Sequence, residues 1–244
     1  YITDTALLLS QWMNAGRSVL FEGAQGTMLD IDHGTYPFIT SSSTTAGGAC
    51  TGSGIPPTKI DGCLGISKAY CTRVGEGPFP TELHGETADL LRSRGNEYGA
   101  VTGRPRRTGW ADAVALRYAV RINGMDTLAI TKLDVLDACE TVKICTGYRY
   151  QGDVLTEFPE EERIWHEAEP VYEEHSGWQT STQGLREYAE LPTKAREYLE
   201  RLSELIGVGF GVVSTGPERD ETILMPDSPL TQWYPSLRGS IPPR

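Results

Sequence analysis

The sequence predicts an α/β fold in which a mostly parallel sheet is flanked by helices and interrupted by loop-rich segments and small β insertions. Three observations lead to this prediction: helical patterns alternate with short apolar strand patterns, glycines separate the two, and strands run directly into polar loops. A length of 244 residues corresponds to one large domain or two small ones. We expect one domain over residues 1–225 and a proline-rich, extended tail over residues 226–244.

The N-terminal third begins with a predicted helix at residues 5–15, with Asp4 as its N-cap and Gly16 as its stop. Residues 18–22 read as a short buried strand that opens into a loop of small residues. Two long irregular regions follow, at residues 40–57 and 73–109. Long loops inside a domain are often functional, so both regions are candidates for ligand binding.

Regular structure returns in the second half of the chain. We expect an insertion of strands and connections at residues 140–182. The clearest patterns are a helix at 110–122 that ends at Asn123-Gly124, a strand at 127–130, a helix at 193–206 that ends at Gly207, and a strand at 209–213.

Charge and cysteine content exclude several classes of protein. The formal net charge is −11, from 33 acidic and 22 basic residues, which argues against a nucleic-acid partner. No apolar run approaches the ~20 residues of a membrane span, and the first residues do not resemble a signal peptide, so we expect a cytoplasmic protein without a membrane partner. The cysteines are odd in number and lack close pairs, which favours reduced thiols over disulfides or a zinc site; they are Cys50, Cys63, Cys71, Cys139 and Cys145.

A cluster of arginines stands out in this acidic chain. Arg104, Arg106 and Arg107 fall within four residues, and Arg92 and Arg94 lie upstream. A guanidinium group binds carboxylates and phosphates through paired hydrogen bonds, so a glycine-flanked arginine cluster suits an anionic ligand. The alternative is a solvated loop whose arginines pair with acidic residues on the protein's own surface.

The segment 131–134 (TKLD) follows the strand predicted at 127–130, at the end of the strand where α/β sheets bind ligands. It matches the Asn/Thr-Lys-x-Asp pattern with which many GTPases recognise guanine. There the aspartate accepts hydrogen bonds from N1–H and the 2-amino group, and the lysine stem packs over the ring. Adenine has an acceptor at N1 and no 2-amino group, so one carboxylate discriminates. The alternative is a chance lysine and aspartate on the surface.

Ser214-Thr215-Gly216 also follows a predicted strand directly. Small hydroxyl side chains and a glycine let the backbone approach a base or ribose closely. The alternative is a simple turn before Pro217.

Residues 30–34 (DIDHG) contain two carboxylates and an imidazole, as a metal site or an acid–base pair would. In an extended segment, Asp30 and Asp32 would share one face and His33 would lie on the other. This alternation argues against a self-contained metal site.

Four longer motifs occur in order along residues 1–225. They are FEGAQGTMLDIDHGTYPFITSSSTTAGG at 21–48, GAVTGRPRRTGW at 99–110, AITKLDVLD at 129–137 and VVSTGPERDETI at 212–223. In sequence and separation they resemble the adenylosuccinate synthetase family. The resemblance implies a truncated P-loop-NTPase-like synthetase fold. It also implies a GTP-dependent ligation of IMP and L-aspartate to adenylosuccinate, GDP and phosphate in AMP (purine) biosynthesis.

The resemblance covers only the C-terminal portion of the family's sequence. The chain has no Gly-x4-Gly-Lys-Ser/Thr phosphate-binding loop. The resemblance therefore implies that the principal base and acid, together with the ligands of Mg2+, belong to an N-terminal portion outside these residues, and that this chain contributes no metal ligand. The alternative function is a nucleotide-binding fragment without turnover.

Residues that match the family's motifs take their implied roles from the resemblance. Gln25 would stabilise the 6-oxygen of IMP, and Asp32 would be a buried acid that orients the catalytic histidine. IMP would be bound by Gln25, Thr40 and Arg104; aspartate by a loop of Ala100, Val101, Thr102, Gly103, Arg104, Pro105 and Arg106; and GTP by Arg106, Lys132, Leu133, Asp134, Ser214, Thr215 and Gly216. The family also implies a homodimer whose other partners are these small molecules.

Overall fold

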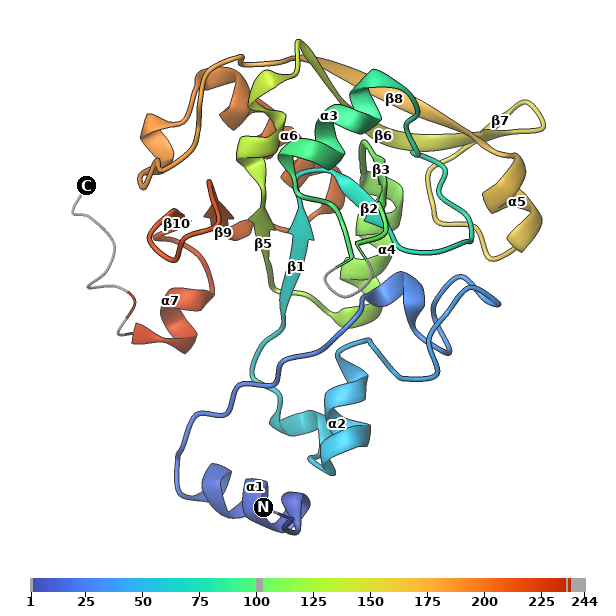
Figure 1. Cartoon of the computed structure of the whole chain (residues 1–244). Coiled ribbons are helices and arrows are strands. Elements are labelled where there is room, and N and C mark those ends of the chain that lie inside the picture. The colour runs from blue at the N-terminus through green and yellow to red at the C-terminus, as the bar shows by residue number, and fades with distance from the viewer. Residues whose placement is uncertain (1, 100–102, 236, 238–244) are drawn as a thin grey trace.

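The main sheet of the molecule is mostly parallel. The computed structural model describes residues 2–99, 103–235 and 237. Strands β1, β5 and β9 run parallel, and β10 pairs with β9 in the antiparallel direction, in the order β1-β5-β9-β10 (Figure 1). The strands span Leu64–Lys68 (β1), Thr127–Thr131 (β5), Phe210–Ser214 (β9) and Thr222–Leu224 (β10). The predicted α/β fold class is confirmed.

Smaller β elements make up the insertions that the sequence predicted. A second sheet has the order β4-β6-β7, with β8 paired to β6, and β2 and β3 form an antiparallel pair. Their bounds are Cys71–Arg73 (β2), Arg107–Gly109 (β3), Ala111–Asp112 (β4), Thr141–Tyr150 (β6), Asp153–Leu155 (β7) and Glu169–Ser176 (β8). The insertion predicted at residues 140–182 therefore consists of strands and connections, with the short helix α5 (Glu162–Glu167) before β8.

Helices α4 (Ala113–Asn123) and α6 (Thr193–Ile206) pack against each other and against the second sheet, α4 on β6 and α6 on β8. Helix α6 has the predicted bounds and buries one face, which includes Tyr198, Leu199 and Leu202. Helix α4 begins three residues later than predicted, because Ala111 and Asp112 form β4 and the Asp112 side chain accepts hydrogen bonds from the backbone N–H groups of Val114 and Ala115. The Asp112 carboxylate thus fixes the first turn of α4.

One apolar cluster links the main sheet to α6. It includes Leu128 and Ile130 of β5, Val213 of β9 and Leu202 of α6, all at most 1% exposed. The hydroxyl of Tyr198, buried in the same cluster, donates to the carbonyl of Ala69, 2.6 Å away, just after β1. The core therefore holds the ends of β1 and β5 in fixed positions relative to α6.

The N-terminal segment departs from the prediction. Helix α1 (Thr5–Asn14) forms with Asp4 as its N-cap, but none of its residues is buried, and it lies apart from the sheets (Figure 1). The strand predicted at residues 18–22 is absent from the described structure, and Leu20 is 80% exposed. A short apolar run becomes a strand only where a neighbouring strand pairs with it, and these residues have no such neighbour in the described chain.

The two irregular regions contain regular elements that the sequence analysis missed. The first holds α2 (Gly47–Ser53) and a 3-10 turn, η2 (Pro57–Lys59). The second holds α3 (Glu86–Arg94), which has acidic residues in its first turn and Arg92 and Arg94 in its last, as the helix dipole favours. The remaining 3-10 turns are η1 (Thr27–Leu29), η3 (Leu133–Ala138) and η4 (Tyr188–Glu190).

The tail is not extended throughout. Residues Leu230–Trp233 form the short helix α7, in which Leu230 and Thr231 are each 6% exposed. A Cβ on Gly211 of β9 would lie 2.8 Å from the Leu230 side chain, so α7 packs closely on β9. The prediction of an extended tail is wrong here because the apolar side chain of Leu230 finds a buried position against the sheet.

Candidate functional site

The carboxyl ends of three parallel strands meet at one edge of the main sheet. Lys68 of β1 pairs in register with Thr131 of β5, and Ile130 of β5 pairs with Val213 of β9. The segments that follow these strands therefore start side by side. The two segments predicted to contact GTP, 132–134 and 214–216, belong to adjacent strand ends. Ligands bind preferentially at this edge of an α/β sheet.

The TKLD segment turns sharply as it leaves β5. Lys132 adopts a left-handed backbone conformation, with φ 61°, and begins η3. This turn buries Leu133 completely and leaves Lys132 and Asp134 half-buried on either side of it. Leu133 is therefore a core residue, and the polar side chains of the motif stay accessible. Burial raises the pKa of the Asp134 carboxyl, while Lys132 and Arg94 oppose that rise.

The segment after β9 uses its hydroxyl groups internally. The Ser214 hydroxyl donates to the carbonyl of Gly216, 2.8 Å away. Thr215 is fully buried, and its hydroxyl donates to the Leu185 carbonyl at 2.8 Å. Both hydroxyl groups therefore donate within the protein, and the Ser214 oxygen can still accept a hydrogen bond from a ligand.

A buried carboxylate connects this edge with the arginine loop. Glu97 has a fully buried side chain, and its Oε2 accepts from Arg106 at 2.8 Å. Its Oε1 accepts from Lys68 at 2.8 Å and from the Tyr70 hydroxyl at 2.6 Å, and lies 3.3 Å from Nζ of Lys132. Burial alone would raise the pKa of Glu97, but these donors lower it to about 2. Glu97 is thus an ionised carboxylate in contact with two of the predicted site residues.

Gly95 makes room for this cluster. Its carbonyl accepts from Nζ of Lys132. A Cβ at this position would collide with the Tyr70 hydroxyl and would lie 2.8 Å from the carbonyl oxygen of Leu91.

We expect Gly95→Ala to lower the free energy of unfolding by about 1–3 kcal/mol, because neither the backbone carbonyl nor the hydrogen-bonded tyrosine can move away freely. Urea unfolding followed by circular dichroism measures this loss. Gly209→Ala is the matched control, since a Cβ there meets nothing within 4 Å. Equal stability of the two variants would contradict the close packing at Gly95.

The arginine cluster separates into different environments. Arg92 donates to the carbonyl of Arg106 at 3.0 Å, and Arg94 donates to that of Asp134 at 3.3 Å, so both brace the backbone of the site. Arg107 forms a paired interaction with Glu82 and is structural. Arg104 is exposed, whereas the Nε of Arg106 is buried and has no hydrogen-bond acceptor among the described residues.

The aspartate loop is described in part. The predicted residues Ala100, Val101 and Thr102 lie outside the described residues. On either side of them, Tyr98 forms an antiparallel bridge with Pro105, and Gly103 has φ 63° and donates its N–H to the Gly99 carbonyl. The described residues on the two sides of the loop are therefore held together by backbone hydrogen bonds, and Arg104 is exposed beside them.

The acidic motif at residues 30–34 forms a turn, so the predicted alternation of faces is wrong. Asp30 is 1% exposed and accepts hydrogen bonds from the backbone N–H groups of Asp32, His33, Thr44 and Thr45 at 2.6 to 3.0 Å. Asp32 is exposed. The buried acid of this motif is thus Asp30, where the sequence analysis expected Asp32. Burial would raise the pKa of Asp30, but the four N–H donors lower it to about 2.

The residues predicted to bind IMP lie on this N-terminal segment. Gln25 is exposed, with φ 64°, and Thr40 is half-buried, with its N–H bonded to the carbonyl of Leu29. The segment is tied to the body through Arg73, which donates to Thr35, and through Asn123, which donates to Thr27. These contacts join it to β2 and to the end of α4, away from the strand ends that carry Lys132 and Ser214.

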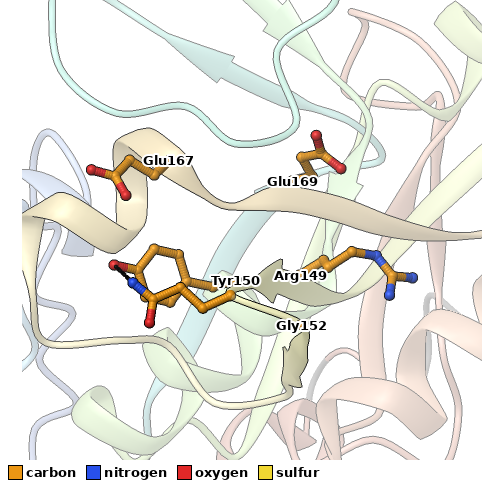
Figure 2. Close-up of a pocket in the computed structure, with 6 residues that line it drawn as sticks. Arg149, Tyr150, Gly152, Glu167 and Glu169 are labelled. Carbon is orange, nitrogen blue, oxygen red and sulfur yellow. Dashed lines mark hydrogen bonds between the residues drawn. The ribbon is translucent and has the colours of Figure 1, made fainter.

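A hollow of about 270 Å³ lies on the second sheet, at the turn between β6 and β7. Figure 2 shows its lining, in which Gln151 donates to the Tyr150 hydroxyl. None of the predicted site residues lines it; the lining residues are Arg149, Tyr150, Gln151, Gly152, Glu167 and Glu169.

Residues 2–99, 103–235 and 237 contain no group of three or more His, Cys, Asp or Glu side chains arranged to hold a metal ion. In the same ranges, no helix has both the length and the apolar character that a membrane span requires.

Comparison with known proteins decides the family. The family model for adenylosuccinate synthetase matches residues 1–223. The chain belongs to the adenylosuccinate synthetase family. Adenylosuccinate synthetases from Geobacter sp. (strain M21) and Citrifermentans bemidjiense are 59% and 58% identical to it over 225 residues, which are 92% of this chain and 52% of each relative. The chain thus spans about half the length of the curated relatives it matches.

A solved structure of the family agrees with the fold. The fully ligated adenylosuccinate synthetase from Plasmodium falciparum matches with a TM-score of 0.89 and 40% identity, over 92% of this chain and 54% of that one. The family assignment made from the four motifs is therefore confirmed, as is the family's fold.

Three residues that meet at the candidate site were not identified from the sequence: Lys68, Tyr70 and Glu97. Only Lys68 has a local signal: it ends a parallel strand, and Lys132 likewise follows one directly. This signal could not be used because strand β1 was not predicted from the sequence.

Proposed function

We propose that the protein is an adenylosuccinate synthetase, a ligase that joins IMP and L-aspartate with the hydrolysis of GTP to GDP and phosphate. The observation that supports this most is the parallel pairing of β5 with β9, because the segments 132–134 and 214–216 then lie at the ends of adjacent strands. Two segments far apart in the sequence, each assigned to guanine by the family resemblance, thereby share one edge of the sheet. We propose that Asp134 accepts hydrogen bonds from N1–H and the 2-amino group of guanine.

The arginines would bind the second substrate. Arg104 is exposed, and the buried Nε–H of Arg106 has no hydrogen-bond acceptor among the described residues. Guanidinium groups suit the two carboxylates of aspartate. We propose that Arg104 also faces the ribose of IMP and that Arg106 lies near GTP, with Gly103 and Thr102 as additional donors to aspartate.

The reaction would have two steps. A base removes the N1 proton of IMP while its 6-oxygen takes the γ-phosphoryl group of GTP; the amine of aspartate then attacks C6 and phosphate leaves. Gln25 would stabilise the developing 6-oxyanion by hydrogen bonding, and Thr40 would hold the IMP phosphate. The principal base and the phosphate-binding loop are not among these 244 residues, so the proposal for turnover concerns the full-length protein that carries this sequence.

Cofactor, assembly and location complete the proposal. We propose that turnover requires Mg2+, that the protein is a homodimer as the family resemblance implies, and that it acts in the cytoplasm. All five cysteines are free thiols, which fits a reducing compartment.

Thermal melting of the full-length protein with IMP and Mg2+ tests the nucleotide assignment. A ligand at 100 times its Kd adds about 2.7 kcal/mol of stability, so GTP should raise the melting temperature and ATP should not. Formation of adenylosuccinate must in addition depend on IMP, aspartate and GTP together. A shift without turnover would favour the alternative, a nucleotide-binding protein. Equal shifts with ATP and GTP would contradict the guanine assignment.

We expect Arg104→Ala to raise the KM for aspartate, because a charged partner of the substrate carboxylates is lost. A hydrogen bond to a charged group contributes about 1.5–3 kcal/mol, which corresponds to roughly a ten- to hundredfold rise. Steady-state assays with varied aspartate measure it. Arg163→Ala, which removes an exposed arginine of α5, is the control. An unchanged KM for aspartate would show that the arginine loop is a solvated surface.

A further inference from the structure

Four side chains from three segments of the chain converge on Glu97. Lys68 ends β1, Tyr70 follows it, Arg106 precedes β3, and Lys132 follows β5. All four side chains meet the carboxylate of Glu97, which itself lies three residues beyond the end of α3. Of these residues, the resemblance assigned roles only to Arg106 and Lys132, and it assigned none to Glu97.

The three cations of this cluster share one carboxylate, that of Glu97. Lys68, Arg106 and Lys132 are three cations that repel one another. Burial lowers the pKa of Lys68, the charges of Lys132 and Arg106 lower it further, and Glu97 opposes this. Glu97 is the carboxylate they share, and its side chain has no exposed surface. A buried charge is stable only when its hydrogen-bonding capacity is met by close partners. Removing the carboxylate would leave three like charges together without a shared anion.

The two carboxylate oxygens of Glu97 contact different members of the cluster. Oε2 accepts from Arg106, whose backbone N–H also donates to the carbonyl of Glu97, at 2.8 Å in each case. Oε1 faces Lys68, Tyr70 and Lys132. Because the two oxygens of one carboxylate have a fixed separation, Glu97 sets the position of the Arg106 guanidinium relative to the Lys132 ammonium.

We propose that Glu97 is a positioning residue that couples the aspartate-binding arginine loop to the guanine-binding strand end. The proposal rests on the function proposed above. In the proposed site Glu97 touches no substrate. It affects the binding of aspartate through Arg106 and the binding of GTP through Lys132. Since both cations are held by one rigid group, a change at Glu97 alters the binding of both substrates together, although the two binding segments lie more than 25 residues apart in sequence.

Steady-state kinetics of Glu97→Gln in the full-length protein test this proposal. Glutamine keeps the size of the side chain but removes the charge and replaces one acceptor oxygen with a donor. We expect the KM for aspartate and the KM for GTP each to rise roughly tenfold, within the range usual for energetic coupling between sites. A purely structural role would reduce the fraction of folded enzyme, and hence the apparent kcat, and would leave both KM values unchanged.

Glu82→Gln is the matched control. Glu82 is also a partly buried partner of an arginine, Arg107, the neighbour of Arg106, with 2.8 Å between Oε1 and Nε. We expect this variant to leave both KM values unchanged. A rise in only one KM for Glu97→Gln, a rise in neither, or an equal rise of both in Glu82→Gln would overturn the proposal.

A second variant and an assay of the unmodified protein separate the possible outcomes. If Glu97→Gln does not fold, Glu97→Asp replaces it, because the charge stays and the reach shortens by one methylene; both KM values must then rise, and unchanged values overturn the proposal. If the unmodified protein shows no dependence on GTP or aspartate, the proposed function itself fails, and this is seen before any variant is made.

Discussion

Asp134→Asn in the full-length protein is expected to shift nucleotide preference from guanine toward xanthine. The Asp134 carboxylate would accept hydrogen bonds from both N1–H and the 2-amino group of guanine. An asparagine amide offers one acceptor and one donor, which suits the N1–H and 2-oxo groups of xanthine instead. Hydrogen bonds to charged groups contribute about 1.5–3 kcal/mol each, so we expect GTP to bind about a hundredfold more weakly or worse.

Calorimetric titration with GTP and XTP measures this change. The half-buried position of Asp134, next to the fully buried Leu133, lets the side chain change without disturbing the core. Asp126→Asn is the control, since Asp126 lies just before the other end of β5 and accepts from the N–H of Cys63 at 2.8 Å. Unchanged GTP affinity in Asp134→Asn, or the same loss in Asp126→Asn, would contradict the assignment.

The protein is expected to lose several kcal/mol of stability as the pH falls from about 4.5 to 2. Asp30 and Glu97 have folded-state pKa values of about 2, below their ordinary values of 3.8 and 4.5. A carboxyl with a depressed pKa binds fewer protons in the folded state, so its contribution is complete above the ordinary value and disappears as the pH falls through the folded one. At 1.36 kcal/mol per pKa unit, the two groups together contribute about 6 kcal/mol.

Urea unfolding between pH 6 and pH 3 checks this effect with Asp30→Asn and Glu97→Gln. Each variant should be much less stable than the unmodified protein at pH 6. The difference should shrink as the pH falls below about 4.5, because the unfolded state of the unmodified protein then binds a proton at this carboxyl and the variant has no carboxyl there. Ile206→Val removes one methyl group from a residue that is 2% exposed and is expected to cost about 0.5–1.5 kcal/mol at every pH. Differences that do not depend on pH would contradict the assignment of these two carboxylates.

The elements with strong periodicity and clear end signals could be predicted. Helix α6 has the predicted bounds because Leu199 and Leu202 share a buried face and Gly207 ends it in the left-handed conformation. The elements that were missed or wrong lack such local signals. Strand β1 leaves Ile66 75% exposed, and residues 18–22, which looked like a buried strand, pair with no neighbour in the described chain.

The acidic motif shows the same limit at the level of one residue. Asp30 and Asp32 are equivalent in a linear pattern, and the resemblance indicated Asp32. The turn at residues 30–34 buries Asp30 alone, because four backbone N–H groups converge on it, two of them from Thr44 and Thr45. A hydrogen-bond partner fourteen residues away leaves no periodic trace in the sequence.

The sequence by itself determined the family, through four ordered motifs, and the α/β class, through alternating helix and strand patterns, because both are written in contiguous residues. Only the tertiary structure decided which motifs meet. The parallel pairing of β5 with β9 places the segments 132–134 and 214–216 at adjacent strand ends, and the buried carboxylate of Glu97 connects Arg106 with Lys132. These contacts depend on the order of the strands in the sheet and on the partners of a buried charge. Both involve residues distant in the chain, so no local sequence pattern reveals them.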